Sequence, residues 1–169
     1  FTEAMQSHQT TDQFQRPVVR PEINLILTHE TNTSDTDIFY IAGTTEGWDN
    51  GYDSTLFGGT ANNFAIYTHL VNDSEGQDLG IQSLPNTNFE NRIIPVGVNA
   101  AAGTTISIAA ATQNLPEGVE VYLEDREAGS FTLLETDEKY TITLSEALNG
   151  IGRFYLYTSA QVLLVDAVA

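Results

Sequence analysis

The stretch INLILT, residues 23–28, carries the pattern that decides the fold. Ile23, Leu25 and Leu27 alternate with the residues between them, which is the period-two pattern of a strand buried on one face. The segments 119–124 and 139–144 repeat this alternation. Thr, Val, Ile, Tyr and Phe, the residue types that suit a pleated sheet, dominate these runs. The sequence therefore predicts an all-β protein.

Clusters of Gly, Pro and Asn separate the runs, as in LPNTN (84–88) and NAAAGTT (99–105). We expect strands near residues 20–29, 37–42, 63–70, 78–83, 92–98, 104–111, 119–124, 130–135, 139–144 and 152–158, with a further one at 161–166. About ten short strands at this spacing are typical of an antiparallel β-sandwich of the jelly-roll-like kind.

The chain is expected to form one domain, because its length lies within the usual size of a single domain. Residues 17–169 would form the β-sandwich domain, and the polar residues 1–16 would be a loosely attached N-terminal segment. The segment 121–135 predicts a hairpin with Asp125 and Gly129 at its turn. SEALNG (145–150) is expected to form one helical turn.

The charge balance excludes some classes of partner. The chain has 23 acidic and 6 basic residues, a formal net charge of −17. Nucleic acid and anionic membrane surfaces are poor partners, because binding them needs clustered cations. There is no cysteine for a disulfide or a thiolate metal site, and no apolar run reaches the ~20 residues needed to span a bilayer. We therefore expect no membrane insertion, and the simplest role for the acids is a solubilising surface.

No catalytic motif stands out, so no catalytic residue is predicted and the protein is expected not to be an enzyme. His29 and His69 lie in strand-like runs without partners at zinc-ligand spacing, which favours ordinary strand residues. A carboxylate pair for glycoside hydrolysis cannot be singled out among 23 acids. A hydrolase remains the least favoured class.

Three acidic loops have the composition of calcium sites: 32–37, 47–53 and 72–78. In the second, Asp49 and Asp53 flank a glycine that lets the chain fold back. The candidate ligands in the third are Asp73, Glu75 and Asp78. Asp and Asn are also ordinary turn formers, so plain turns are the alternative at each loop and no cofactor other than calcium is expected.

The second loop also holds Trp48, the single tryptophan. Trp48 and Tyr52 could stack on the apolar face of a sugar while Asn50 and Asp49 bond its hydroxyls, which would make extracellular polysaccharide a candidate partner. The alternative is that Trp48 plugs one end of the sandwich. In FYLY (154–157) both strand faces are apolar, which indicates a central strand covered on both sides.

Eight fragments in order form a recognisable pattern: FTEAM (1–5), RPEINLIL (20–27), GWDNGYDSTLFGG (47–59), LGIQSLP (79–85), RIIPVGV (92–98), VYLEDREAGSFTLL (121–134), KYTITL (139–144) and GRFYLY (152–157). Together they resemble the β-rich module beside the C-terminal sorting domain of Bacteroidetes cell-surface proteins exported by the type IX secretion system. The resemblance covers nearly the whole chain, from residue 1 to about residue 158.

This resemblance implies a non-enzymatic accessory module of a secreted or cell-surface, adhesin-like protein on the outer-membrane exterior. It implies that the chain is a piece of a longer polypeptide, beginning partway through the family's region, and that the rest of that polypeptide is its partner. It supplies no catalytic or ligand residues. Gly47, Asp49, Gly51, Tyr52 and Asp53 match the best-kept loop of the pattern, which a turn could explain without any ligand.

Overall fold

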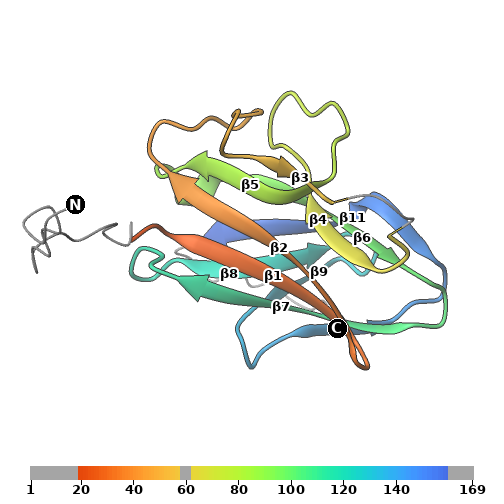
Figure 1. The fold of residues 1–169 in the computed structure, drawn as a ribbon. Helices are drawn as coiled ribbons and strands as arrows, with labels where there is room; N and C mark the ends of the chain where they lie inside the picture. The colour runs from red at the N-terminus through yellow and green to blue at the C-terminus, as the bar shows by residue number, and fades with distance from the viewer. Residues whose placement is uncertain (1–18, 58–61, 160–169) are drawn as a thin grey trace, which may run out of the picture.

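The computed structural model describes residues 19–57 and 62–159. These residues form one sheet of eleven strands and one 3₁₀ turn (Figure 1). The elements are β1 (Glu22–His29), β2 (Asn32–Ile41), β3 (Ser54–Thr55), β4 (Ala65–Thr68), β5 (Leu79–Pro85), η2 (Phe89–Asn91), β6 (Ile93–Ala100), β7 (Thr105–Gln113), β8 (Glu120–Asp125), β9 (Ser130–Leu133), β10 (Tyr140–Thr143) and β11 (Leu148–Ser159). The prediction of an all-β protein is confirmed.

The strand order is β10-β7-β1-β2-β5-β4-β6-β11-β8-β9, with β3 paired to β5. The sheet is mixed, because β2 and β5 run parallel, from Asp37 opposite Ile81 to Ile41 opposite Pro85. A wholly antiparallel sheet was the wrong expectation at this pair. Parallel neighbours need a long crossover, and residues 42–78 supply it.

The sheet curves until it is nearly barrel-shaped. The strands at the two ends of its order, β9 and β10, follow each other in the chain and are joined by residues 134–139. A turn in this connection is closed by the Glu135 amide, which donates to the Glu138 carbonyl over 2.8 Å. Side chains also cross the gap, since the Tyr140 hydroxyl of β10 donates to Asp125 at the end of β8. In Figure 1, β2, β1 and β7 form one wall of the molecule, and β11 passes behind it.

The core fills the space between these walls and follows the alternation in the sequence. Ile23, Leu25 and Leu27 have no exposed surface. They pack in one cluster with apolar residues of β2, β4, β6, β7, β8 and β11. Burying side chains of this size stabilises the fold by about 1.5–3 kcal/mol each. Period-two burial is thus confirmed as the source of the fold.

Most predicted strands are found close to their expected positions, and the β8–β9 hairpin is confirmed, with Gly129 at a φ of +64°. Two local predictions are wrong. Residues 145–150 do not form a helical turn, because Leu148–Gly150 pair with β6. Residues 32–37 form no loop for calcium, because they belong to β2 and pair with β1. The segments 1–16 and 161–166 lie outside the described residues.

The strand β11 is central, between β6 and β8, as FYLY predicted. Phe154 and Leu156 are buried in the core, whereas Tyr155 and Tyr157 on the other face are only half-buried. That face is covered by single side chains: the Arg126 guanidinium lies 3.4 Å from the centre of the Tyr155 ring. The second face is therefore partly covered rather than sealed.

Candidate functional site

The loop between β2 and β3, residues 42–53, is called the Trp48 loop here and is held by its own aspartates. One carboxylate oxygen of Asp49 accepts the Thr45 amide at 2.6 Å and the Thr45 hydroxyl at 3.1 Å. The Asp49 carbonyl accepts the amides of Tyr52 and Asp53. Gly51 has a φ of +84°, a conformation that glycine adopts without strain. These bonds close a compact turn.

Asp53 ties this turn to the sheet. Its Oδ2 accepts the Asp49 amide at 2.6 Å, and its Oδ1 accepts the Ser83 amide of β5 at 2.7 Å. Burial raises the pKa of Asp53, the two amide bonds oppose that rise, and the nearby Asp49 charge adds to it. The carboxylate therefore serves as an anchor between the loop and β5.

The aromatic rings of the loop face solvent. Trp48 is 40% exposed and Tyr52 is 50% exposed. The Trp48 indole N–H donates to the Asn50 side-chain oxygen over 2.9 Å, which fixes the ring against the loop. This exposure does not fit a tryptophan that plugs the end of the fold. The loop thus presents two rings and one amide at the surface.

A buried arginine supports the loop from below. Arg92 is 4% exposed, and its Nε donates to Glu46 Oε1 over 2.9 Å. Its Nη1 donates to the carbonyls of Pro85 and Asn88. Asn72, in the neighbouring loop, donates its side-chain amide to the other oxygen of Glu46. No local spacing in the sequence marks the Arg92–Glu46 pair, because the two residues are 46 positions apart in the chain.

The acids of the 72–78 loop are not gathered. Asp73 and Glu75 are exposed. Asp78 Oδ1 lies 2.7 Å from His69 Nε2, and His69 directly follows β4. His29 is the last residue of β1, and its Nδ1 lies 2.9 Å from the Thr105 carbonyl oxygen. Each histidine therefore bonds to a neighbouring group of the protein, His69 to a loop carboxylate and His29 to a strand carbonyl.

The structure brings the Trp48-loop residues together and leaves the other calcium candidates apart. In residues 19–57 and 62–159, no group of three or more His, Asp or Glu side chains is placed to hold a metal ion. Three of the four carboxylate oxygens of Asp49 and Asp53 accept backbone N–H groups. Calcium at this loop would have to compete with those bonds.

A buried ionic cluster, which we call the Asp125 cluster, consists of Asp125, Tyr140 and Arg153. The Asp125 side chain is fully buried and receives Arg153 through Nε at 3.1 Å and Nη2 at 2.8 Å. The Tyr140 hydroxyl donates to the same carboxylate at 2.5 Å, and the Ala128 amide donates at 3.1 Å. Sequence reasoning placed Asp125 only at a hairpin turn, because its partners lie on β10 and β11.

Electrostatics in this cluster favour the ionised aspartate. Burial by itself would raise the pKa of Asp125, but the bonds from Arg153, Tyr140 and the Ala128 amide hold it below its usual value. Burial and the bond to Asp125 raise the pKa of Tyr140 to about 12. The cluster joins the end of β8 to β10 and β11, so it closes the gap between the ends of the sheet.

Comparison with known proteins adds one finding. Residues 1–157 match the family described as Domain of unknown function (DUF8693). The chain belongs to this family. Neither a curated protein nor a solved structure matched the chain. The description of the family names no activity, so membership of the family does not assign one to this chain. Among the described residues, no helix has the length and apolar character that crossing a membrane would need.

Proposed function

We propose that this domain is a non-catalytic accessory module of a secreted or cell-surface, adhesin-like bacterial protein exported by type IX secretion. It would act as a folded spacer within a longer polypeptide, and the remainder of that polypeptide would be its partner. We also propose that the two walls of the curved sheet are the layers of a jelly-roll-like sandwich, on the ground that one core cluster draws residues from both walls.

One observation supports this proposal most directly: the buried charged groups Asp125, Arg92 and Asp53 bind other groups of the protein itself. Asp125 binds Arg153 and Tyr140, and Arg92 binds Glu46. Asp53 binds backbone amides of the loop and of β5. Groups held in this way stabilise a shape, which is the task of a spacer. The net charge of −17 also suits a solvated exterior.

The export proposal is tested in the source bacterium with an antibody against this domain. Intact wild-type cells, or their medium, should carry the domain, and a strain that lacks the type IX translocon should retain it inside. Labelling that is unchanged in the translocon mutant would exclude this export route. The accessory role is tested separately, by assaying the parent protein after deletion of the domain with its flanking regions intact. Loss of a catalytic step in a deletion variant that remains folded would contradict that role.

A second candidate function is carbohydrate binding at the Trp48 loop. The observation that favours it is the joint exposure of Trp48 and Tyr52, with the Trp48 ring fixed by Asn50. A fixed aromatic ring can stack on a sugar without losing much conformational freedom. Titration of Trp48 fluorescence with neutral oligosaccharides tests it. An emission spectrum that stays unchanged at saturating sugar would remove this candidate.

Calcium binding at the acidic loops is a separate proposal and is tested by thermal unfolding. A bound ion raises the midpoint by mass action, so millimolar Ca²⁺ should raise it relative to EDTA. Asp49→Asn would abolish the rise if the Trp48 loop holds the ion, and Asp78→Asn would do so if the 72–78 loop holds it. Equal midpoints in Ca²⁺ and EDTA would leave both loops as plain turns.

A further inference from the structure

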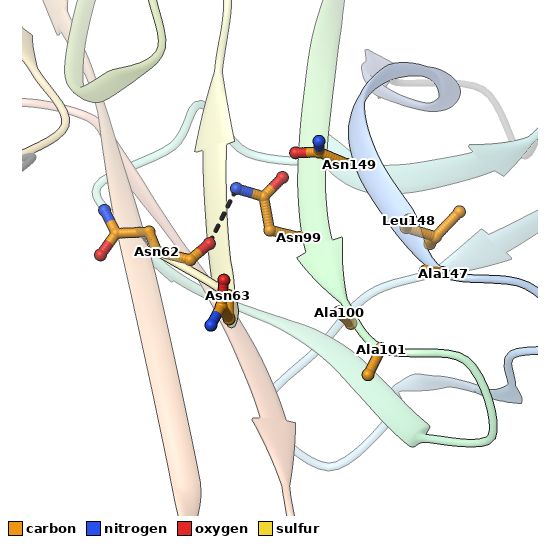
Figure 2. A pocket seen from close by; sticks show the side chains of 8 residues that line it. All are labelled: Asn62, Asn63, Asn99, Ala100, Ala101, Ala147, Leu148 and Asn149. Carbon is orange, nitrogen blue, oxygen red and sulfur yellow. Dashed lines mark hydrogen bonds between the residues drawn. The ribbon is translucent and has the colours of Figure 1, made fainter. Parts of the chain in front are cut away.

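A cleft lies where the start of β4, the end of β6 and the start of β11 meet (Figure 2). Its volume is about 510 Å³, within the range of small-ligand sites. We call it the asparagine cleft, because Asn62, Asn63, Asn99 and Asn149 line it with Ala100, Ala101, Ala147 and Leu148. Four of the twelve asparagines in the chain thus surround one small space, which marks its chemistry as amide-rich.

Strand pairing builds the amide row. Asn99 of β6 lies opposite Asn149 of β11 and opposite Ala65 of β4. Side chains at opposed positions of antiparallel strands point to the same face. Asn63 is two residues before Ala65 and adds a further amide to the row at the start of β4. The strand at Leu148–Gly150, where the sequence predicted a helical turn, is what brings Asn149 into this row.

The side-chain amide of Asn99 is held by two hydrogen bonds, and that of Asn62 donates to the Phe57 carbonyl. Asn99 Oδ1 accepts the Tyr67 hydroxyl at 3.1 Å, and its Nδ2 donates to the Asn62 carbonyl at 3.0 Å, as Figure 2 shows for the second bond. Among the residues that the structure describes, the side-chain amides of Asn63 and Asn149 have no hydrogen-bond partner in the protein. The cleft therefore offers two open amides beside a rigid third one.

The cleft is uncharged in a strongly acidic protein. None of its eight lining residues carries a charge, although the whole chain has a net charge of −17. Without a cation it gives no strong attraction to phosphate or carboxylate, and without an acid it is a poor site for metals. Its alanines and Leu148 supply a small apolar surface beside the amides. A primary amide both donates and accepts, which matches neighbouring hydroxyl groups.

We propose that the asparagine cleft binds a neutral, hydroxyl-rich ligand of the oligosaccharide class. Asn63 and Asn149 bond its hydroxyls, Asn99 holds the geometry of the row, and Leu148 with the alanines contacts its C–H groups. This goes beyond the proposed spacer role, which requires no ligand. It also differs from the Trp48-loop candidate, because none of the lining residues belongs to that loop.

The test is an NMR titration of the ¹⁵N-labelled domain with cellotetraose, maltotetraose and mannotetraose. The side-chain NH₂ signals of Asn63 and Asn149 report the cleft directly, and Asn63→Ala and Asn149→Ala assign them by removal. At least one neutral tetrasaccharide should shift both signals in a saturable way. Trigalacturonate and tetra-alanine are the anionic and peptide comparisons.

Variants separate the cleft from other surfaces. Asn63→Ala and Asn149→Ala should each weaken binding about fivefold, the effect of losing one neutral hydrogen bond. Asn32→Ala, an exposed strand asparagine outside the cleft, should leave the affinity reported by the Asn63 and Asn149 signals unchanged. All three variants should keep the wild-type unfolding midpoint.

Three outcomes would overturn the assignment. The first is that none of the three neutral tetrasaccharides shifts the Asn63 and Asn149 signals. The second is that only trigalacturonate or tetra-alanine shifts them. The third is that Trp48→Ala abolishes binding while both cleft variants retain it, which would place the sugar at the Trp48 loop. None of these results would change the spacer proposal, which the export and deletion experiments test independently.

Discussion

The ring of Tyr67 on β4 lies directly over Gly97 on β6. A Cβ at Gly97 would stand 2.0 Å from a ring carbon of Tyr67. The two residues are opposed across the strand pair, and the hydroxyl of the same ring donates to Asn99. The glycine thus provides the space that sets the position of the ring, and the ring in turn helps to fix the asparagine cleft.

Gly97→Ala should destabilise the domain by about 1–3 kcal/mol, the usual cost of overpacking a filled site. Urea unfolding measures it. Gly80→Ala on β5 is the matched control, because a Cβ there would meet Leu56 at an ordinary 3.5 Å. Equal stabilities of the two variants would contradict the close packing of Tyr67 on Gly97.

Asp125→Asn should cost about 3 kcal/mol, because it removes the buried charged partner of the largely buried Arg153. Glu127 also pairs with Arg153 at 2.8 Å, but its side chain is 65% exposed. Glu127→Gln should therefore change stability by less than about 1 kcal/mol. Denaturant unfolding of both variants checks the contrast, and a Glu127→Gln effect as large as that of Asp125→Asn would refute it.

The Asp125 cluster should also give the domain a characteristic pH dependence. Asp125 has a lower pKa in the folded than in the unfolded chain, so its contribution is complete above about pH 4 and is lost as the pH falls further. Tyr140 behaves in the opposite sense. Its pKa rises to about 12 in the fold, so its contribution is complete below about pH 10 and is lost as the pH approaches 12.

Unfolding free energies measured across these two ranges test the signs. Asp125→Asn should reduce the loss of unfolding free energy below about pH 4, and Tyr140→Phe should reduce the loss between about pH 10 and 12. A Tyr140→Phe variant that loses as much unfolding free energy between about pH 10 and 12 as the wild type, within about 0.5 kcal/mol, would show that the Tyr140 phenol does not cause the alkaline loss of stability.

Asp53→Asn should loosen the Trp48 loop. The amide side chain has one acceptor oxygen in place of two, so the backbone N–H of either Asp49 or Ser83 loses its partner. We expect a loss of about 1–3 kcal/mol and stronger acrylamide quenching of Trp48 fluorescence. Asp73→Asn is the control, since Asp73 is exposed with a φ of +53°, a conformation that asparagine tolerates well. A quenching constant unchanged in Asp53→Asn would rule out the anchoring role.

Glu30→Asn should stabilise the β1–β2 hairpin. Glu30 has a φ of +51° in the two-residue turn between His29 and Asn32, a region where asparagine is favoured over glutamate. A gain of about 0.5–1 kcal/mol is expected from relief of this backbone strain. Thr31→Asn, at the next turn position, lacks a positive φ and should give no such gain. A melting temperature that falls in Glu30→Asn would contradict the strain.

The fold was predictable where burial alone decides it. The alternation at Ile23, Leu25 and Leu27 predicted a strand with one buried face, and these side chains are fully buried. The parallel pairing of β2 with β5 was not predictable, because the same alternation is compatible with either strand direction. The prediction of a helical turn at residues 145–150 was wrong, because residues 145–148 include good helix formers, whereas the pairing of Leu148–Gly150 with β6 depends on residues far away in the chain.

The candidate site was partly predictable for a similar reason. Trp48, Asp49, Asn50 and Asp53 act within one short segment, so their types and spacing indicated a turn. They did not decide between a Trp48 that plugs the sandwich and one that faces solvent, which the 40% exposure of Trp48 settles in favour of solvent. The Asp125 cluster and the asparagine cleft are assembled from distant strands. No local spacing marks them, and only the strand order brings Arg153 to Asp125 or Asn149 to Asn99.

The strand order has a mechanical consequence. In the part of the chain that the structure describes, the first strand β1 lies between β7 and β2, and the last strand β11 lies between β6 and β8. A pulling force applied through the two ends of the domain loads these interior strands, each of which is held by hydrogen bonds along both sides. Extension must break the hydrogen bonds on both sides of β1 and of β11. The force therefore acts on interior strands and not on an edge strand that could separate from one neighbour alone.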